Sequence, residues 1–193
     1  MQFPQYQVRK SLRCYVNCIM MDASEDPSGS LEYPLYADGY PGIMFQKAEH
    51  GLFMLPAGKK LSGLFLYGQT LSPMALSAQG RFQFVVFQLY PFASKYLLNM
   101  DPKALNDECY DLLQLKNIEA GKFHGRLLAA DDLPTQVEVI SDLVEALLSA
   151  HKLREDDRIQ ATIHHIIRNK GMGRSKICAI GFPSRREPSR GTS

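Results

Sequence analysis

Several patterns that mark reactive or membrane-spanning proteins are missing from this sequence. Its four cysteines form no CxxC pair, and no group of cysteine and histidine has the spacing of a zinc site. There is no phosphate-binding glycine loop, no GxSxG and no HExxH motif. No run approaches about 18 apolar residues, and no signal-peptide core follows the basic residues near the N-terminus. We therefore expect a cytoplasmic protein that spans no membrane, holds no metal or cofactor, has no catalytic residues and is not an enzyme.

The cysteines and histidines that are present carry little chemical signal. Cys14 and Cys18 are four residues apart, which would suit one face of a helix and a metal, but reduced, buried apolar side chains are the simpler interpretation. No HxH pair lies on an expected strand. We expect solvated or helix-capping roles for the five histidines, which are His50, His124, His151, His164 and His165.

Charge is spread unevenly along the chain. The net charge is +2, but residues 171–193 hold five basic residues and one acidic residue, so they carry +4 and the remainder carries −2. A mildly acidic body gives no support to nucleic-acid binding there. The segment from 172 to 193 has no hydrophobic period, and its composition predicts a disordered basic tail.

The first ninety residues, by contrast, have the pattern of a β-rich domain. Short apolar runs alternate with Gly, Pro and Asp, which predicts an antiparallel sandwich or barrel. The run 81–90 is apolar on both faces, so we expect one face inside the barrel and the other under helices. The expected strands are 15–22, 33–37, 42–47, 52–55, 63–67, 73–77 and 81–90.

From residue 91 onward the apolar period becomes helical. Pro91 is expected at the first position of a helix, Asp101-Pro102 opens a second one, and a third lies near 118–130. Asp131, Asp132 and Pro134 begin an amphipathic helix, in which helix capping explains the acidic pair. A last helix starts at Asp156-Asp157. The two apolar stripes are Val137, Ile140, Val144 and Leu147, and Ile159, Ile163, Ile166 and Ile167.

A small set of polar and aromatic residues predicts a ligand pocket. Gly68-Gln69 directly follows an apolar strand, which implies a backbone constraint and a polar side chain near the core. Gln88 is a polar residue inside the most apolar strand. A barrel with few convergent polar groups suits a small ligand, and strand alternation gives Phe45, Gln69, Phe84 and Gln88 as the pocket candidates.

Four segments follow one another in a recognisable order: Leu-Arg-Cys-Tyr-Val (12–16), Tyr-Ala-Asp-Gly-Tyr-Pro-Gly-Ile-Met-Phe (36–45), Leu-Tyr-Gly-Gln (66–69) and the step from strand to helix at 84–93. This order resembles the N-terminal sensor domain of bacterial AraC-type transcription regulators. The sequence departs from that pattern at Tyr36-Ala37, where the family has Leu-Pro. It departs again at Gln88–Pro91, where an arginine-rich step is usual.

The resemblance implies an α+β fold, with a small cupin-like antiparallel barrel or sandwich packed against a C-terminal helical subdomain. It implies a sensor domain at 1–155 and the first helix of a helix-turn-helix DNA-binding domain at 156–171. The tail at 172–193 then looks out of frame, because a one-nucleotide slip near Met172 allows the neighbouring frame to encode a helix-turn-helix-like string. The expected function is effector binding or dimerisation. We expect no specific DNA binding by this chain, since DNA is a partner only of a full-length relative.

Two other interpretations stay open. A small barrel enzyme or ligand carrier would need a metal or a cluster of titratable groups inside the barrel. An interaction module that forms a homodimer would use the stripes at 137–147 and 159–167.

Overall fold

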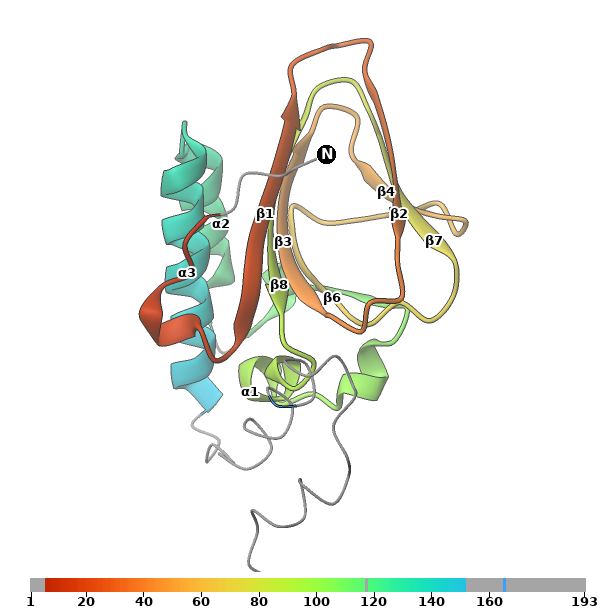
Figure 1. Cartoon of the computed structure of the whole chain (residues 1–193). Coiled ribbons are helices and arrows are strands. Elements are labelled where there is room, and N and C mark those ends of the chain that lie inside the picture. Colours follow the sequence, from red (N-terminus) through yellow and green to blue (C-terminus); the bar gives the residue numbers. More distant parts are fainter. Residues whose placement is uncertain (1–5, 117, 152–164, 166–193) are drawn as a thin grey trace, which may run out of the picture. The chain divides into compact units, whose positions relative to one another are not determined.

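Alternating apolar residues in the first half of the chain build two antiparallel sheets (Figure 1). The computed structural model describes residues 6–116, 118–151 and 165. Apart from His165, these belong to Met1–Leu153, the first of two compact units into which the chain divides. The helix expected at 156–171 and the tail expected at 172–193 therefore lie outside the described residues, apart from His165.

The larger sheet has five strands in the order β1-β8-β3-β6-β9, and the smaller has four in the order β2-β7-β4-β5. The strands of the larger sheet are β1 (Val16–Ser24), β3 (Gly42–Ala48), β6 (Leu64–Tyr67), β8 (Phe82–Leu89) and β9 (Cys109–Asp111). Those of the smaller are β2 (Ser30–Leu35), β4 (Leu52–Leu55), β5 (Lys59–Lys60) and β7 (Met74–Gln79). Each of the seven predicted strands is present within a few residues. The sequence pattern missed β5 and β9, which are too short to show a period.

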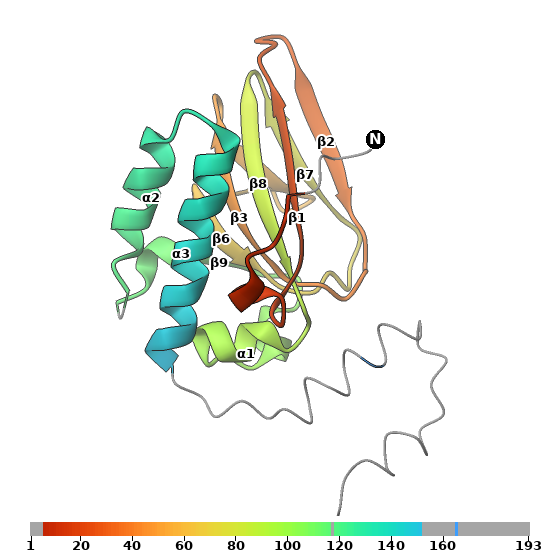
Figure 2. The same ribbon diagram turned by 60° about the vertical axis from the view of Figure 1, so that its left-hand side comes forward.

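Strand β8 is buried on both faces, as its composition predicts. Phe84 and Val86 face the second sheet and join the core between the sheets, while Val85 and Phe87 are completely buried on the opposite face. Helices α2 (Ala120–Ala129) and α3 (Leu133–His151) cover that opposite face in both views (Figures 1 and 2). The expected α+β class, with a sandwich of sheets and helices concentrated in the C-terminal part, is confirmed.

The helices begin close to the expected places, with one exception. Helix α1 (Ala93–Leu98) has Phe92 as its N-cap, so Pro91 lies before the helix and the prediction of its N1 position was wrong. Asp101 caps the 3-10 helix η2 (Pro102–Leu105) by accepting a hydrogen bond from the Lys103 backbone N–H, as expected. The other 3-10 helices are η1 (Lys10–Leu12) and η3 (Leu112–Gln114).

The amphipathic helix predicted after Asp132 is α3, and its stripe faces the domain. Asp132 accepts hydrogen bonds from the backbone N–H and the hydroxyl of Thr135, at 2.7 and 2.8 Å. The four stripe residues are almost completely buried, and they are Val137, Ile140, Val144 and Leu147. This stripe is therefore already covered within the domain. Among the described helices, none is long and apolar enough to cross a membrane.

The cysteines near the N-terminus differ from expectation. Cys14 is exposed, although a buried apolar role was predicted for it, and Cys18 lies half-buried on strand β1. Because β1 starts at Val16, these two residues do not share a helical face. The described residues contain no group of three or more His, Cys, Asp or Glu that could hold a metal.

Candidate functional site

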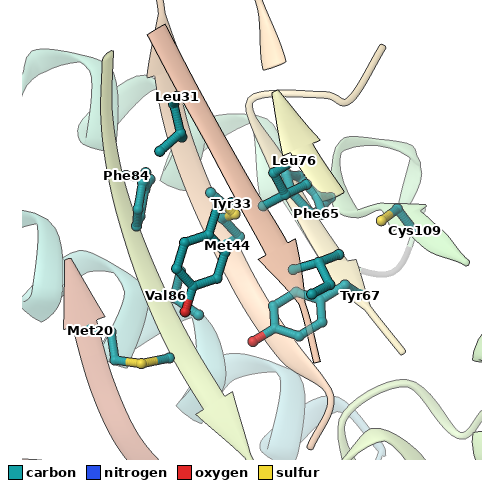
Figure 3. A pocket seen from close by; sticks show the side chains of 11 residues that line it. Met20, Leu31, Tyr33, Met44, Phe65, Tyr67, Leu76, Phe84, Val86 and Cys109 are labelled. Atoms are coloured by element: carbon teal, nitrogen blue, oxygen red, sulfur yellow. The ribbon is translucent and has the colours of Figure 1, made fainter. Parts of the chain in front are cut away.

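A small apolar cavity lies between the two sheets (Figure 3). The volume that the centre of a water-sized sphere can occupy inside it is about 60 Å³. One wall comes from β1, β3, β6, β8 and β9 of the larger sheet, and the other comes from β2 and β7 of the smaller sheet. The lining residues are Met20, Leu31, Tyr33, Leu35, Met44, Phe65, Tyr67, Leu76, Phe84, Val86 and Cys109.

Strand register explains why these side chains meet. Met44 on β3 pairs with Phe65 on β6 and with Val86 on β8, so all three point to the same face of the larger sheet. On the edge strand β2, residues alternate between exposed and half-buried, and the half-buried ones are Leu31, Tyr33 and Leu35. Successive side chains along a strand point to opposite faces, so a strand in the wall turns every second side chain toward the cavity.

Two tyrosine hydroxyl groups provide the hydrogen-bonding oxygens of this wall. The oxygens of Tyr33 and Tyr67 are turned toward the same end of the cavity in Figure 3. Neither hydroxyl forms a hydrogen bond to another described residue. Burial raises the pKa of the Tyr67 phenol, and the nearby Asp38 carboxylate raises it further, so this hydroxyl stays protonated. The site therefore offers two phenol hydroxyls, and a phenol hydroxyl can both donate and accept a hydrogen bond.

Beside that end of the cavity lies a small polar network. The Gln88 side chain donates to Asp38 at 2.9 Å and accepts from the Asn17 amide at 2.7 Å. The Cys18 thiol is 3.3 Å from the same Gln88 oxygen. Asp38 also accepts from the backbone N–H of Tyr40 at 2.9 Å. The Gln88 amide is thus held in place by its neighbours rather than aimed into the cavity.

The thiol in the cavity wall is not activated. Cys109 lies 3.9 Å from the Met54 sulfur, and burial raises the pKa of its thiol to about 11. Burial also raises the pKa of Cys18. A thiolate is the reactive form of cysteine, so both groups are poor nucleophiles at neutral pH.

The structure brings only one of the four predicted pocket residues into the cavity wall, namely Phe84. Phe45 is completely buried on the opposite face of β3, where its ring meets His124 of α2 at 6.1 Å. Gln88 belongs to the network just described. The backbone carbonyl of Gln69 accepts a hydrogen bond from the N–H of Asp107, and its side chain does not line the cavity. Whether any of them contacts a ligand remains a prediction.

Sequence reasoning missed the two tyrosines. Tyr33 lies in an expected strand, and the alternation of Leu31, Tyr33 and Leu35 would have placed it on the inward face. Tyr67 ends another expected strand, directly before Gly68-Gln69. The Gly68-Gln69 pattern predicted an amide near the cavity, whereas the polar group in the wall belongs to the preceding residue, Tyr67.

His124 also departs from expectation, because it is packed rather than solvated or capping. Its Nε2 atom lies 2.5 Å from the position that a Cβ on Gly63 would take, and its ring contacts Phe45 edge-on. Burial lowers the pKa of His124 below its ordinary value of 6.5, although Asp111 opposes this. His50, in contrast, is exposed as expected.

A second, more open hollow lies near α2, but its charges are mixed. Lys47, Lys60 and Arg81 line it together with Glu25 and Glu49. The Lys47 ammonium donates to the carbonyl oxygen of Leu128 at 3.1 Å, at the end of α2. Because this cation already serves the helix terminus, the hollow offers no concentrated charge for a ligand.

Comparison with known proteins gives one family. The family model described as "Domain of unknown function (DUF6597)" matches residues 4–111, which is more than half of the chain and includes all nine strands. No curated protein and no solved structure matches the chain. The matched residues include the entire cavity wall. The chain therefore belongs to the DUF6597 family.

Proposed function

We propose that this chain is the regulatory part of an AraC-type transcription regulator and that its cavity binds a small-molecule effector. The order of sequence motifs supports the regulator class. The cavity between the sheets supports effector binding, and it is the observation that carries the proposal.

The cavity is better explained by binding than by folding alone. Protein interiors are packed about as densely as organic crystals, and apolar voids reduce stability. The hydroxyls of Tyr33 and Tyr67 also have no hydrogen-bond partner among the described residues, so both are available to a ligand. A fold that keeps both features inside one apolar space has the properties of a preformed ligand site.

The lining supports binding over catalysis. Its ionisable groups are two tyrosines and the protonated Cys109, and it contains no carboxylate, imidazole or ammonium group. General acid–base catalysis near neutral pH uses such groups. We therefore propose a binding role without a chemical step.

Dimerisation is a separate part of the proposal and needs a surface other than the stripe at 137–147. That stripe is buried against the rest of the domain. A second copy of the chain stays a predicted partner, and gel filtration of the protein with and without residues 156–193 tests the contribution of that segment.

A thermal-shift screen against a metabolite library tests effector binding, because a ligand that binds only the folded state raises its stability. The matched variant is Val86→Phe, which places a larger side chain into the cavity. We expect at least one compound to raise the melting temperature of the natural protein and not that of the variant. Failure of every compound, or equal shifts in both proteins, would count against the proposal.

A further inference from the structure

We propose that the ligand of this cavity is a small uncharged molecule with an apolar body and one hydroxyl or carbonyl oxygen, which the hydroxyls of Tyr33 and Tyr67 recognise. This inference rests on the proposed function, since it names the chemical class of the effector. Three features of the cavity carry it: the charge around it, the place of the two hydroxyls, and its size.

The charge distribution excludes ionic ligands. No cationic side chain lines the cavity, so a carboxylate or phosphate would lose its hydration without gaining a partner. The Asp38 carboxylate, whose charge raises the pKa of Tyr67, already accepts from Gln88 and from the Tyr40 backbone, and its field acts against an anion. A cation would also leave water for a wall of apolar side chains, because Asp38 is exposed and does not line the cavity.

The two hydroxyls set the place of the ligand's oxygen. They face one end of the cavity from different sheets, Tyr33 from β2 and Tyr67 from β6 (Figure 3). A single ligand oxygen at that end has two lone pairs and can accept a hydrogen bond from both phenols. The other end is walled by Leu31, Leu76 and Phe84, which fits an apolar body and offers nothing to a second polar group.

The volume sets the scale of the ligand. The space for the centre of a water-sized sphere is about 60 Å³, so the cavity has room for more than one water and suits a small ligand. A short straight-chain alcohol such as 1-pentanol serves as a probe of this class. A sugar or a nucleotide would be too large and too polar.

The test is a titration of protein labelled with ¹³C at the methionine methyl groups and followed by NMR. Met20 lines the cavity, whereas its neighbour Met21 is buried on the opposite face of β1 and serves as the internal control. The probes are 1-pentanol, hexanoate and pentylammonium, which share a five-carbon alkyl chain and differ in the head group. We expect 1-pentanol to shift Met20 and Met44 with little change at Met21, and to bind at least about tenfold more tightly than either ion.

The role of the hydroxyls is tested with Tyr33→Phe, Tyr67→Phe and the matched control Tyr110→Phe. Tyr110 lies on β9 but does not line the cavity. A lost hydrogen bond corresponds to about a threefold to tenfold weaker affinity. We expect this loss in each of the first two variants, and unchanged affinity in the control.

Several results would overturn the inference: no binding of 1-pentanol, equal binding of an ion, unchanged affinity in both cavity variants, or persistent Met20 shifts in Val86→Phe. The proposed function fails separately. One such outcome is a library compound that binds the natural protein but not Val86→Phe, and that binds both tyrosine variants with unchanged affinity. That result would support effector binding and contradict recognition by the two hydroxyls.

Discussion

At the residue scale, two positions of this fold require glycine because neighbouring atoms lie where a Cβ would have to be. A Cβ on Gly68 would lie 1.7 Å from the backbone carbonyl oxygen of Leu105, and a Cβ on Gly42 would lie 2.3 Å from the Tyr67 hydroxyl. Neither glycine has a positive φ, so the requirement is space rather than backbone conformation. The backbone constraint expected at Gly68-Gln69 is thus the close contact of the residue after β6 with Leu105, the last residue of η2.

Gly68→Ala tests this contact. Because the collision is with backbone rather than with a flexible side chain, we expect a loss of about 3 kcal/mol in the free energy of unfolding, at the upper end for overpacking. The control is Gly121→Ala in helix α2, where a Cβ meets nothing within 4 Å. That change should raise stability by up to about 1 kcal/mol through helix propensity. Urea denaturation measures both, and a loss below about 1 kcal/mol for Gly68→Ala would contradict the account.

His124 makes stability depend on pH. Its pKa is lowered in the folded state, so the unfolded chain takes up a proton at a higher pH than the folded protein does. Stability from this group is present above pH 6.5 and is lost as the pH falls through the folded value. His124→Gln should flatten this slope, whereas the exposed His50→Gln should leave it in place. Urea midpoints between pH 7.5 and 5 measure it, and an unchanged slope in His124→Gln would rule the effect out.

At the element scale, an ionic cluster joins the N-terminal segment to α3. Arg9 reaches three acidic residues on one face of that helix, at 2.8 Å from Asp142, 3.1 Å from Glu145 and through an ion pair with Glu138. Ser11 donates to Glu145 at 2.6 Å. Since Leu12 in η1 is completely buried, this cluster holds a segment that also contributes to the core.

Arg9→Ala should lower the free energy of unfolding by about 1 kcal/mol, because several charges act together, and the loss should shrink at 1 M salt. Lys122→Ala provides the comparison, since its pair with Glu119 is exposed and lies within one helix turn. That change should cost less than about 0.5 kcal/mol. Equal effects of the two substitutions would show that the cluster has no special role.

Strand β2 is an edge strand in the cavity wall, and among the described strands it pairs with β7 alone. It carries Pro34, which is tolerated at an edge because the residue has no N–H to donate. Edge elements with few buried contacts open most readily, so ligand binding should slow hydrogen exchange in β2 more than in the central strand β3. Mass spectrometry of exchange with and without ligand measures this. Protection confined to β3 would place the ligand elsewhere.

At the scale of the whole molecule, the elements could be predicted from the sequence and the site could not. Period-2 alternation and turn residues are local signals, so seven strands and the helix after Asp132 were predicted close to their observed bounds. Which face of β3 meets the second sheet depends on long-range pairing. For that reason Phe45 was predicted in the pocket but lies under α2, while Tyr33 and Tyr67 were missed.

The charge of the molecule gives one further prediction. Residues 1–170 carry −2, so the body should not attract DNA, and the five basic residues at 171–193 should bind it at most weakly. An electrophoretic mobility shift assay with the DNA upstream of the protein's own gene should show no shifted protein–DNA band at physiological salt. A sequence-specific complex that survives higher salt would contradict this expectation.

The central claim is that the cavity between the sheets binds a small-molecule effector. Isothermal titration calorimetry tests it directly, with the best compound from the thermal-shift screen titrated into the natural protein and into Val86→Phe. We expect one site per chain, an affinity at least about tenfold weaker in the variant, and an unfolding midpoint in the variant no lower than that of the natural protein. Equal affinity in two folded proteins would contradict it.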